Sequence, residues 1–335
     1  MITIKSTTGM SDFEVFEVDG AQQGKLGIDK ISIVVDVPKD QLVHYAEYGK
    51  ELNLMIKAGF PMHWDTRVKK NGYRSSLRFK ISGVQGTQRP LLQFGPYQEE
   101  NGFMRLELNP NRLETKGVAE LKTELDLVTP HGWPSFLEWG KVTRVDASLD
   151  VPVPLDSIIW DSRYAVHRDR YLSNGRPETI YLGKKENGKS FVRVYDYNAK
   201  HAPDSLQPVT RIERQQKLDA PFSELAVLNN VFHGARLYSW RCPAPDNIPI
   251  GTWAMFREQV SRVGLTRALF FLQPELRAST KAHVVKYKSE LIDLEASWVV
   301  WPAVVDGLGL TTPGPHGPNI PFIDASVPKD LLGQV

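Results

Sequence analysis

The sequence predicts an α+β fold made of a duplicated β-α-β-β-β-α unit with antiparallel sheets, followed by a helical C-terminal region. The first observation is a repeat: residues 30–38 and 144–152 each carry a base, an acid and Val-Pro at the same spacing. The second is that a later strand of each half contains Arg-x-Glu, at 105–107 and 211–213. A period of about 110 residues is too long for a solenoid and indicates two domain-sized halves.

The elements of each half follow from alternating apolar residues, which predict strands, and from apolar spacing of three and four, which predicts helices. After the strand at 30–38 we expect a helix at 39–57, strands at 73–81, 91–97 and 103–109, and a helix at 112–127. After the strand at 144–152 we expect a helix at 155–164, strands at 179–183, 191–197 and 209–214, and a helix at 221–230. The helices are expected to cover one face of each sheet.

Composition limits the class of protein. A hydrophobic content of 41% in 335 residues is enough for one large or two ordinary domains with real cores. Cys242 is the only cysteine, so we expect neither a disulfide framework nor a cysteine metal cluster, and a reducing cytoplasm fits. No apolar run approaches the length of a membrane helix and no signal pattern opens the chain, so membrane insertion is not expected.

The net charge of +2 conceals a strongly basic segment. Residues 57–89 carry eight Lys or Arg side chains against the single acid Asp65. Such a segment suits a nucleic-acid phosphate backbone, and a solvated hairpin is the alternative. The residues expected to contact DNA are Lys69, Lys70, Arg74, Arg78 and Lys80, together with Arg144 in the second half.

Beyond Asn230 the apolar spacing predicts helices at 253–263, 266–272, 282–292 and 294–305. Basic residues outnumber acidic residues in this region. Two interpretations stay open: a second DNA-contacting or partner-docking module, or helices that pack together with a solvated basic face.

Residues Gly183 to Ser190 match the P-loop pattern G-x-x-x-x-G-K-[ST] letter for letter. A P-loop binds phosphate only where the glycine-rich turn leads from a strand into a helix. Here Phe191 to Tyr195 alternates with period two, and Asn187-Gly188 is a preferred hairpin turn. We therefore expect a β-hairpin and no nucleotide site.

The strand expected after this hairpin has two unlike faces. Its valines take one face, and the other face carries Arg193, Tyr195 and Tyr197. The following strand adds Arg211 and Glu213 in the same way. One open sheet face is then expected to gather a phenol, a carboxylate and two guanidinium groups, as a phosphodiester-cleaving site needs.

The strand from Arg144 to Asp150 offers two carboxylates on its polar face. Asp146 and Asp150 stand roughly 13 Å apart along a strand, which is too far for both to bind one metal ion directly. One of them can join Glu213 in holding a hard cation, and Asp146 is favoured because it shares the Arg-x-acid position with Glu107 and Glu213. The alternative is that these acids form cross-strand ion pairs.

Four motifs follow one another in the second half: Thr-Arg-Val-Asp-Ala-Ser-Leu-Asp from Thr143, Thr-Ile-Tyr-Leu-Gly from Thr179, Phe-Val-Arg-Val-Tyr-Asp from Phe191 and Val-Thr-Arg-Ile-Glu from Val209. Together they resemble the rolling-circle replication initiation factor family of plasmids and filamentous phages, most clearly over residues 140–217. Where that family continues Tyr-Asp-Lys, this chain has a tyrosine. It also lacks the paired histidines of the His-hydrophobe-His nicking enzymes.

The resemblance implies a metal-dependent tyrosine DNA endonuclease with nicking and rejoining activity. Tyr195 is then the nucleophile that attacks a phosphodiester at an origin, frees a 3′-hydroxyl for a polymerase and keeps the 5′-phosphate as a phosphotyrosine. Asp146 and Glu213 are expected to hold Mg²⁺ or Mn²⁺, while Arg193 and Arg211 stabilise charge on the phosphate oxygens. Rejoining needs no ATP because the covalent bond conserves the energy.

The resemblance further implies double-stranded and single-stranded origin DNA and a host helicase as partners, in the cytoplasm of a bacterial host cell. We expect a weakly ordered N-terminal segment at 1–26, a DNA-binding half at 27–139, a half with the catalytic tyrosine at 140–235, a helical region at 236–310 and a disordered tail at 311–335. Two other classes stay open. Carboxylates on a split α+β sheet also suit a palm-type nucleotidyl transferase, and a non-catalytic DNA-binding initiator or regulator would use Tyr195 to stack on a base.

Overall fold

The computed structural model of the chain divides into two compact units. It describes residues 2–5, 15–18, 21–57, 64–65, 72–96, 103–162, 168–173, 176–182, 190–201, 204–239, 242–287, 289–292 and 294–314. The first unit comprises Met1–Asp29, Arg144–Leu218 and Val227–Val304, and the second comprises Lys30–Thr143, Asp219–Ala226 and Val305–Val335. The first unit contains all the residues predicted to cleave a phosphodiester.

The first unit is built on an antiparallel sheet. Its strands follow the order β10 (Arg168–Ser173), β11 (Arg176–Leu182), β12 (Ser190–Asp196), β13 (Thr210–Pro221), β8 (Gly140–Val151) and β3 (Ala21–Val35), and β2 (Val15–Val18) pairs β3 and β1 (Ile2–Lys5). The expected alternation is confirmed in β8, where Val145, Ala147 and Leu149 are completely buried. The neighbouring residues of that strand therefore form the polar face of the sheet.

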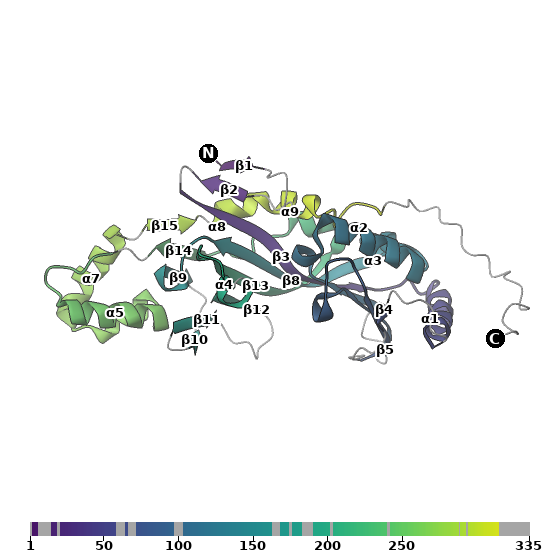
Figure 1. The fold of residues 1–335 in the computed structure, drawn as a ribbon, viewed down its shortest axis with the longest axis horizontal. Coiled ribbons are helices and arrows are strands. Elements are labelled where there is room, and N and C mark those ends of the chain that lie inside the picture. The colour runs from purple at the N-terminus through teal and green to yellow at the C-terminus, as the bar shows by residue number, and fades with distance from the viewer. Residues whose placement is uncertain are drawn as a thin grey trace, which may run out of the picture. The chain divides into compact units, whose positions relative to one another are not determined.

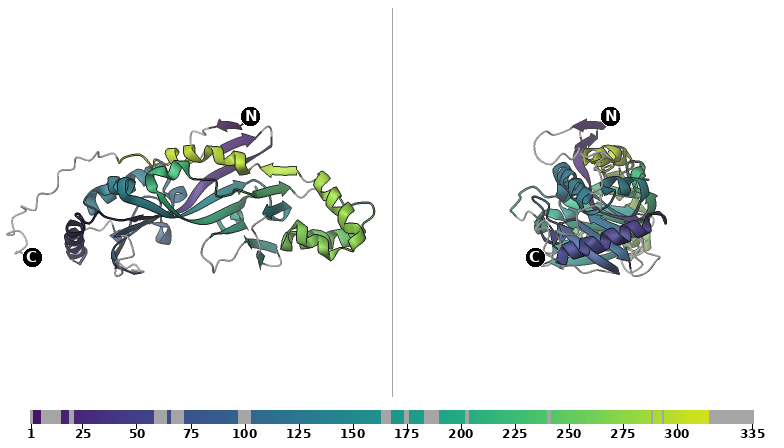
Figure 2. Two further views of the ribbon diagram at one scale, coloured as in Figure 1. Left: turned by 180° about the vertical axis from the view of Figure 1, so that it is seen from behind. Right: turned by 90° about the vertical axis from the view of Figure 1, so that its right-hand side faces the viewer.

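A second, smaller sheet and several short helices complete the first unit (Figure 2). The sheet has the order β15 (Ser289–Ile292), β14 (Ala235–Ser239), β9 (Ile158–Ser162). The helices are η2 (Leu155–Ser157), α4 (Tyr197–His201), α5 (Ile250–Val263), α6 (Leu265–Ala268), η5 (Leu269–Phe271), α7 (Pro274–Tyr287), α8 (Leu294–Ser297), η6 (Trp298–Val300) and α9 (Trp301–Gly307). The C-terminal helices were expected, whereas β14 and β15 among them were not.

The second unit is an antiparallel sheet with helices along one face (Figure 1). Its strands follow the order β3, β7 (Met104–Leu108), β6 (Leu91–Pro96), β5 (Tyr73–Phe79), β4 (Trp64–Asp65). Its helices are α1 (Leu42–Lys57), η1 (Gly86–Gln88), α2 (Pro110–Val128), α3 (Gly132–Trp139) and η4 (Phe222–Val227). Asn109 caps α2 because its side chain accepts a hydrogen bond from the Arg112 backbone nitrogen at 3.2 Å, and Pro110 occupies the first turn.

The α+β class and the antiparallel sheets are confirmed, and the first half follows the predicted order closely. The second half departs from it at residues 155–164. The helix expected there is wrong: Leu155–Ser157 forms a 3₁₀ turn, and Ile158–Ser162 is strand β9, which pairs with β14. Two isoleucines and a tryptophan favour a strand wherever a partner strand is available, and the local apolar spacing cannot reveal that partner.

The other departures lie at the ends of elements. The helix expected at 221–230 is the short 3₁₀ helix η4, and the one expected at 282–292 ends at Tyr287, before strand β15. In the N-terminal segment 1–26, the described residues form β1, β2 and the start of β3, and its expected weak order stays a prediction. The expected tail is described only to residue 314, and the rest of it lies outside the described residues.

The hairpin interpretation of the P-loop match is supported on both flanks. Residues 183–189 lie outside the described residues, but the chain enters β12 directly at Ser190. Strands β11 and β12 are antiparallel, with Leu182 opposite Val192. A strand therefore follows the glycine-rich segment where a P-loop needs a helix. Within the described chain, none of the helices has the length and apolar character that crossing a membrane requires.

Candidate active site

Strand β12 places Tyr195 and Arg193 on the face opposite its buried valines. Across the ladder to β13, Tyr195 stands opposite Arg211 and Arg193 stands opposite Glu213. The Arg193 guanidinium lies over the Tyr195 ring at 5.0 Å, and its Nε donates to Glu213 Oε2 at 2.8 Å. The predicted gathering of a phenol, two guanidinium groups and a carboxylate is therefore what these two strands form.

Tyr197 does not continue this strand face as expected. β12 ends at Asp196, and Tyr197 begins the short helix α4. Its ring nevertheless lies beside the network, because the Arg211 guanidinium is 4.1 Å from its centroid. Tyr197 thus contacts the same cluster from a helix.

Arg211 is enclosed by two carboxylates. Its Nε donates to Asp150 Oδ1 at 2.6 Å and its Nη2 donates to Asp150 Oδ2 at 2.7 Å. Its Nη1 donates to both oxygens of Asp29 at 3.1 Å. Burial lowers the pKa of this guanidinium, but the hydrogen bonds to Asp150 and the charge of Asp29 outweigh burial and hold the pKa above its usual value.

The acids of β8 are divided between two arginines. Asp146 accepts from Arg144 Nε at 2.7 Å, whereas Asp150 pairs with Arg211. Asp150 therefore forms the cross-strand ion pair that the alternative expected, whereas Asp146 pairs with an arginine of its own strand. Among the described residues, no three His, Cys, Asp or Glu side chains are arranged to hold a metal ion.

Glu213 lies in an environment rich in negative charge. Burial raises the pKa of this carboxyl, the charges of Asp29 and Asp146 raise it further, and Arg193 opposes them. Four acids face three arginines in the cluster of Asp29, Asp146, Asp150, Glu213, Arg144, Arg193 and Arg211. Its formal charge is therefore negative when all four acids are ionised.

The face that carries Tyr195 was expected to be open, and this expectation is wrong. Tyr195 is only 6% exposed, and Glu213 and Arg211 are 7% and 8% exposed. Burial raises the pKa of the Tyr195 phenol, and the nearby Glu213 raises it further. Part of the physical reason is that the Arg193 guanidinium lies across the Tyr195 ring.

The predicted DNA-contacting residues are spread over different surroundings. Lys69 and Lys70 lie outside the described residues, while Arg74 is exposed on strand β5 and Lys80 is exposed directly after it. Arg78 donates from Nη1 to the backbone oxygens of Thr87, at 2.8 Å, and Arg89, at 3.0 Å, so it supports a turn. Arg144 is paired with Asp146. The two exposed residues, Arg74 and Lys80, are thus the described members best placed to meet a phosphate.

Asp29 is the cluster member that sequence reasoning missed. It was assigned no role because the first strand was expected to begin only at residue 30. Leu26 and Ile28 are completely buried, and their alternation with shorter residues was the available signal that the strand begins earlier.

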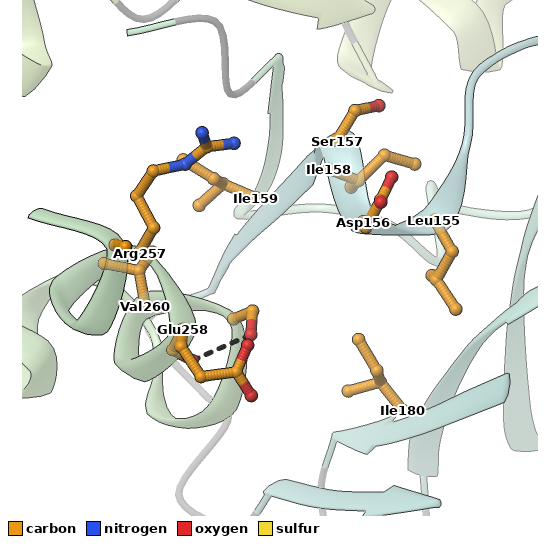
Figure 3. Close-up of a pocket in the computed structure, with 11 residues that line it drawn as sticks. Leu155, Asp156, Ser157, Ile158, Ile159, Ile180, Arg257, Glu258 and Val260 are labelled. Atoms are coloured by element: carbon orange, nitrogen blue, oxygen red, sulfur yellow. Dashed lines mark hydrogen bonds between the residues drawn. The ribbon is translucent and has the colours of Figure 1, made fainter. Parts of the chain in front are cut away.

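A cavity of about 320 Å³ lies elsewhere in the first unit (Figure 3). Ile158, Ile159 and Ile180 contribute apolar wall, and Arg257 and Glu258 reach it from α5. None of its lining residues belongs to the predicted site. The cavity is therefore separate from the tyrosine cluster.

Comparison with known proteins finds a structural likeness. No protein-family model matches the sequence, and no curated protein matches it. The structure is similar to that of a rolling circle replication initiator protein from Geobacillus stearothermophilus, at 14% sequence identity and a TM-score of 0.37. The match covers 71% of this chain and 97% of that chain.

Proposed function

We propose that this chain initiates DNA replication by nicking one strand with Tyr195 as the nucleophile. The observation that carries the proposal is the position of Tyr195 on β12, with Arg193 over its ring and Arg211 directly opposite on β13. A tyrosine among guanidinium groups is suited to phosphodiesters, because the cations attract the phosphate and oppose the charge that develops during attack. Initiation at an origin is what the resemblance of the strand motifs to replication initiation factors implies.

The attack transfers phosphorus from one oxygen to another. The Tyr195 oxygen bonds to phosphorus, the bond from phosphorus to the 3′ oxygen breaks, and that oxygen takes up a proton from solvent to leave as a hydroxyl. Glu213 is the group we assign to accept the phenol proton. Its raised pKa makes it a stronger base than an ordinary carboxylate, and it interacts electrostatically with Tyr195.

The two arginines have different tasks in this proposal. The Arg193 side chain is 31% exposed, and among the described residues its Nη1 makes no hydrogen bond. Arg193 can therefore offer a donor to a phosphate oxygen while it holds Glu213. The Arg211 side chain is 10% exposed and donates to two carboxylates, so we assign it to positioning the strands.

The sequence analysis expects Asp146 and Glu213 to hold Mg²⁺ or Mn²⁺. The contacts of these two residues in the structure do not fit such an ion. Arg144 binds both oxygens of Asp146, and Arg193 binds Glu213. A cation would need these same oxygens as ligands, so the proposed mechanism assigns no step to a metal ion. Cleavage measured in EDTA, Mg²⁺ and Mn²⁺ tests the requirement directly.

A second function is favoured by one observation, the burial of Tyr195. A phenol that is 6% exposed and whose pKa is raised is poorly placed for attack in this state. A DNA-binding initiator or regulator without cleavage needs no exposed nucleophile. For the first proposal to hold, binding of DNA has to uncover Tyr195.

The experiment uses supercoiled DNA that carries the chain's own gene and flanking sequence. Wild-type protein is expected to produce nicked circles and a protein–DNA adduct on a denaturing gel. Tyr195→Phe keeps the ring but removes the attacking oxygen, so both products should vanish, whereas Tyr197→Phe should retain activity. DNA binding by wild type without nicks or adduct under any of the metal conditions would support the non-catalytic function instead.

A further inference from the structure

The segment Ile250–Tyr287, containing α5, α6, η5 and α7, is a basic stretch of the chain in addition to residues 57–89. It holds six Lys or Arg residues and two Glu residues, a net charge of +4. The whole chain has 41 basic and 39 acidic residues, a net charge of +2, so this segment is more positive than the chain as a whole. We call this segment the basic helical module. A polyanion is the partner that such a charge distribution favours.

The module also exposes two adjacent aromatic rings. Phe270 and Phe271 are 68% and 65% exposed, while the flanking Leu269 and Leu272 are buried in the core of the module. The 3₁₀ turn η5 causes this arrangement, because the buried Leu269 within it and the buried Leu272 directly after it hold the turn and leave the two rings outside. Two neighbouring exposed phenylalanines on a packed turn mark a contact surface.

Arg277 holds this turn in place. Its Nε donates to the Leu272 backbone oxygen at 3.0 Å, its Nη2 donates to that of Phe270 at 3.3 Å, and its guanidinium lies 5.1 Å from the Phe270 ring centroid. Arg267 is exposed and stands three residues before Phe270, a spacing that places both on one side of the turn. The rings are thus bordered by cations on a supported backbone.

We infer that the basic helical module binds single-stranded DNA by stacking bases on Phe270 and Phe271 while its arginines and lysines meet the phosphates. Exposed aromatic rings with surrounding positive charge are how proteins bind unpaired strands without regard to sequence. In a duplex the base faces are already stacked on one another, so the rings have no comparable partner there. The choice of single-stranded DNA rests on the proposed function, because nicking produces an unpaired strand.

The test measures binding of full-length protein to a fluorescent oligo-dT by anisotropy. Phe270→Ala with Phe271→Ala should weaken binding roughly tenfold for each ring lost. Phe270→Leu with Phe271→Leu keeps the surface apolar but removes the stacking faces, so it should weaken binding similarly. Phe270→Trp with Phe271→Trp should retain it. Val299→Ala, at a residue 67% exposed outside the module, is the matched control and should change nothing.

Each outcome of this test shows whether single-stranded DNA or another partner binds the surface formed by Phe270 and Phe271. If the double leucine variant binds oligo-dT like wild type, stacking is refuted and the rings serve an apolar partner such as a lipid surface or a second copy. If wild-type protein does not bind oligo-dT, the inference fails even where Tyr195 forms its adduct. If oligo-dT binding depends on both rings but no adduct forms, the inference stands and the nicking proposal fails.

Discussion

At the scale of residues, the buried ion pairs around Arg211 dominate the candidate site. Arg211 bridges Asp29 on β3 and Asp150 on β8 from its place on β13. A buried pair of this kind adds little net stability over apolar residues of similar volume, but the loss of one partner leaves uncompensated charge. Arg211 therefore connects three strands through an interaction whose removal is costly.

Replacing Arg211 tests this directly. Arg211→Met should lower the free energy of unfolding by about 3 kcal/mol, because Asp29 and Asp150 remain buried without their cation. The control is Arg262→Ala, which removes an exposed pair with Glu258 at 3.4 Å and should cost less than about 1 kcal/mol. Urea unfolding measures both, and equal losses would contradict the structural role of Arg211.

Alternation along β12 and β13 correctly predicted that Arg193, Tyr195, Arg211 and Glu213 share one face. It did not predict which guanidinium pairs with which carboxylate, because the pairs depend on strand order and register, which the local pattern does not contain. Asp29 shows the same limit, since it reaches Arg211 from a strand far away in sequence. The expectation that this face is open was wrong for a related reason. The length and direction of the side chains determine whether arginines cover a tyrosine, and the alternation does not contain them.

At the scale of elements, Lys122 connects helix α2 to the segment after α9. Its Nζ donates to the backbone oxygens of Gly309 and Thr312 at 2.6 Å and lies 5.1 Å from the Trp133 ring centroid. Burial lowers the pKa of this ammonium to about 8, and Asp126 partly opposes the shift. The folded protein therefore releases this proton at a lower pH than the unfolded chain does.

This difference predicts a pH dependence of stability. Between about pH 8 and pH 10.4 the unfolded chain still holds the Lys122 proton, so the unfolded state binds more protons and stability should rise with pH. Lys122→Met should remove that rise, whereas Lys116→Met, at an exposed position of α2, should keep it. Unfolding free energies at a series of pH values provide the measurement, and parallel curves for wild type and Lys122→Met would refute the assignment.

Elements with a complete local signal were predicted well, and those determined by distant partners were not. Helix α2 has its cap, its proline and its apolar spacing within a short stretch, and it lies where it was expected. Strand β9 has no such local signal. It depends on β14, more than 70 residues later, and its sequence was read as a helix.

At the scale of the whole molecule, the basic helical module is predicted to govern the salt dependence of oligo-dT binding. Each phosphate contact to a single strand contributes about 0.7 to the slope of log affinity against log salt. Removing Arg267 and Lys281, both exposed in the basic helical module, should reduce the slope for oligo-dT by about 1.4. Replacing the exposed Lys39 and Lys116 of the second unit should leave it unchanged. If replacing Lys39 and Lys116 reduced the slope as much as replacing Arg267 and Lys281, the salt dependence would not come from the basic helical module.

The central claim is that Tyr195 forms a bond with DNA, and mapping of the adduct tests it most directly. Wild-type protein is incubated with supercoiled substrate, the DNA is digested by nuclease, and the protease peptides are sequenced by mass spectrometry. We predict one modified peptide, with a 5′-nucleotide on the oxygen of Tyr195 and none on the neighbouring Tyr197 or Tyr181. A nucleotide on any other residue, or nicked DNA without any modified peptide, would contradict the claim.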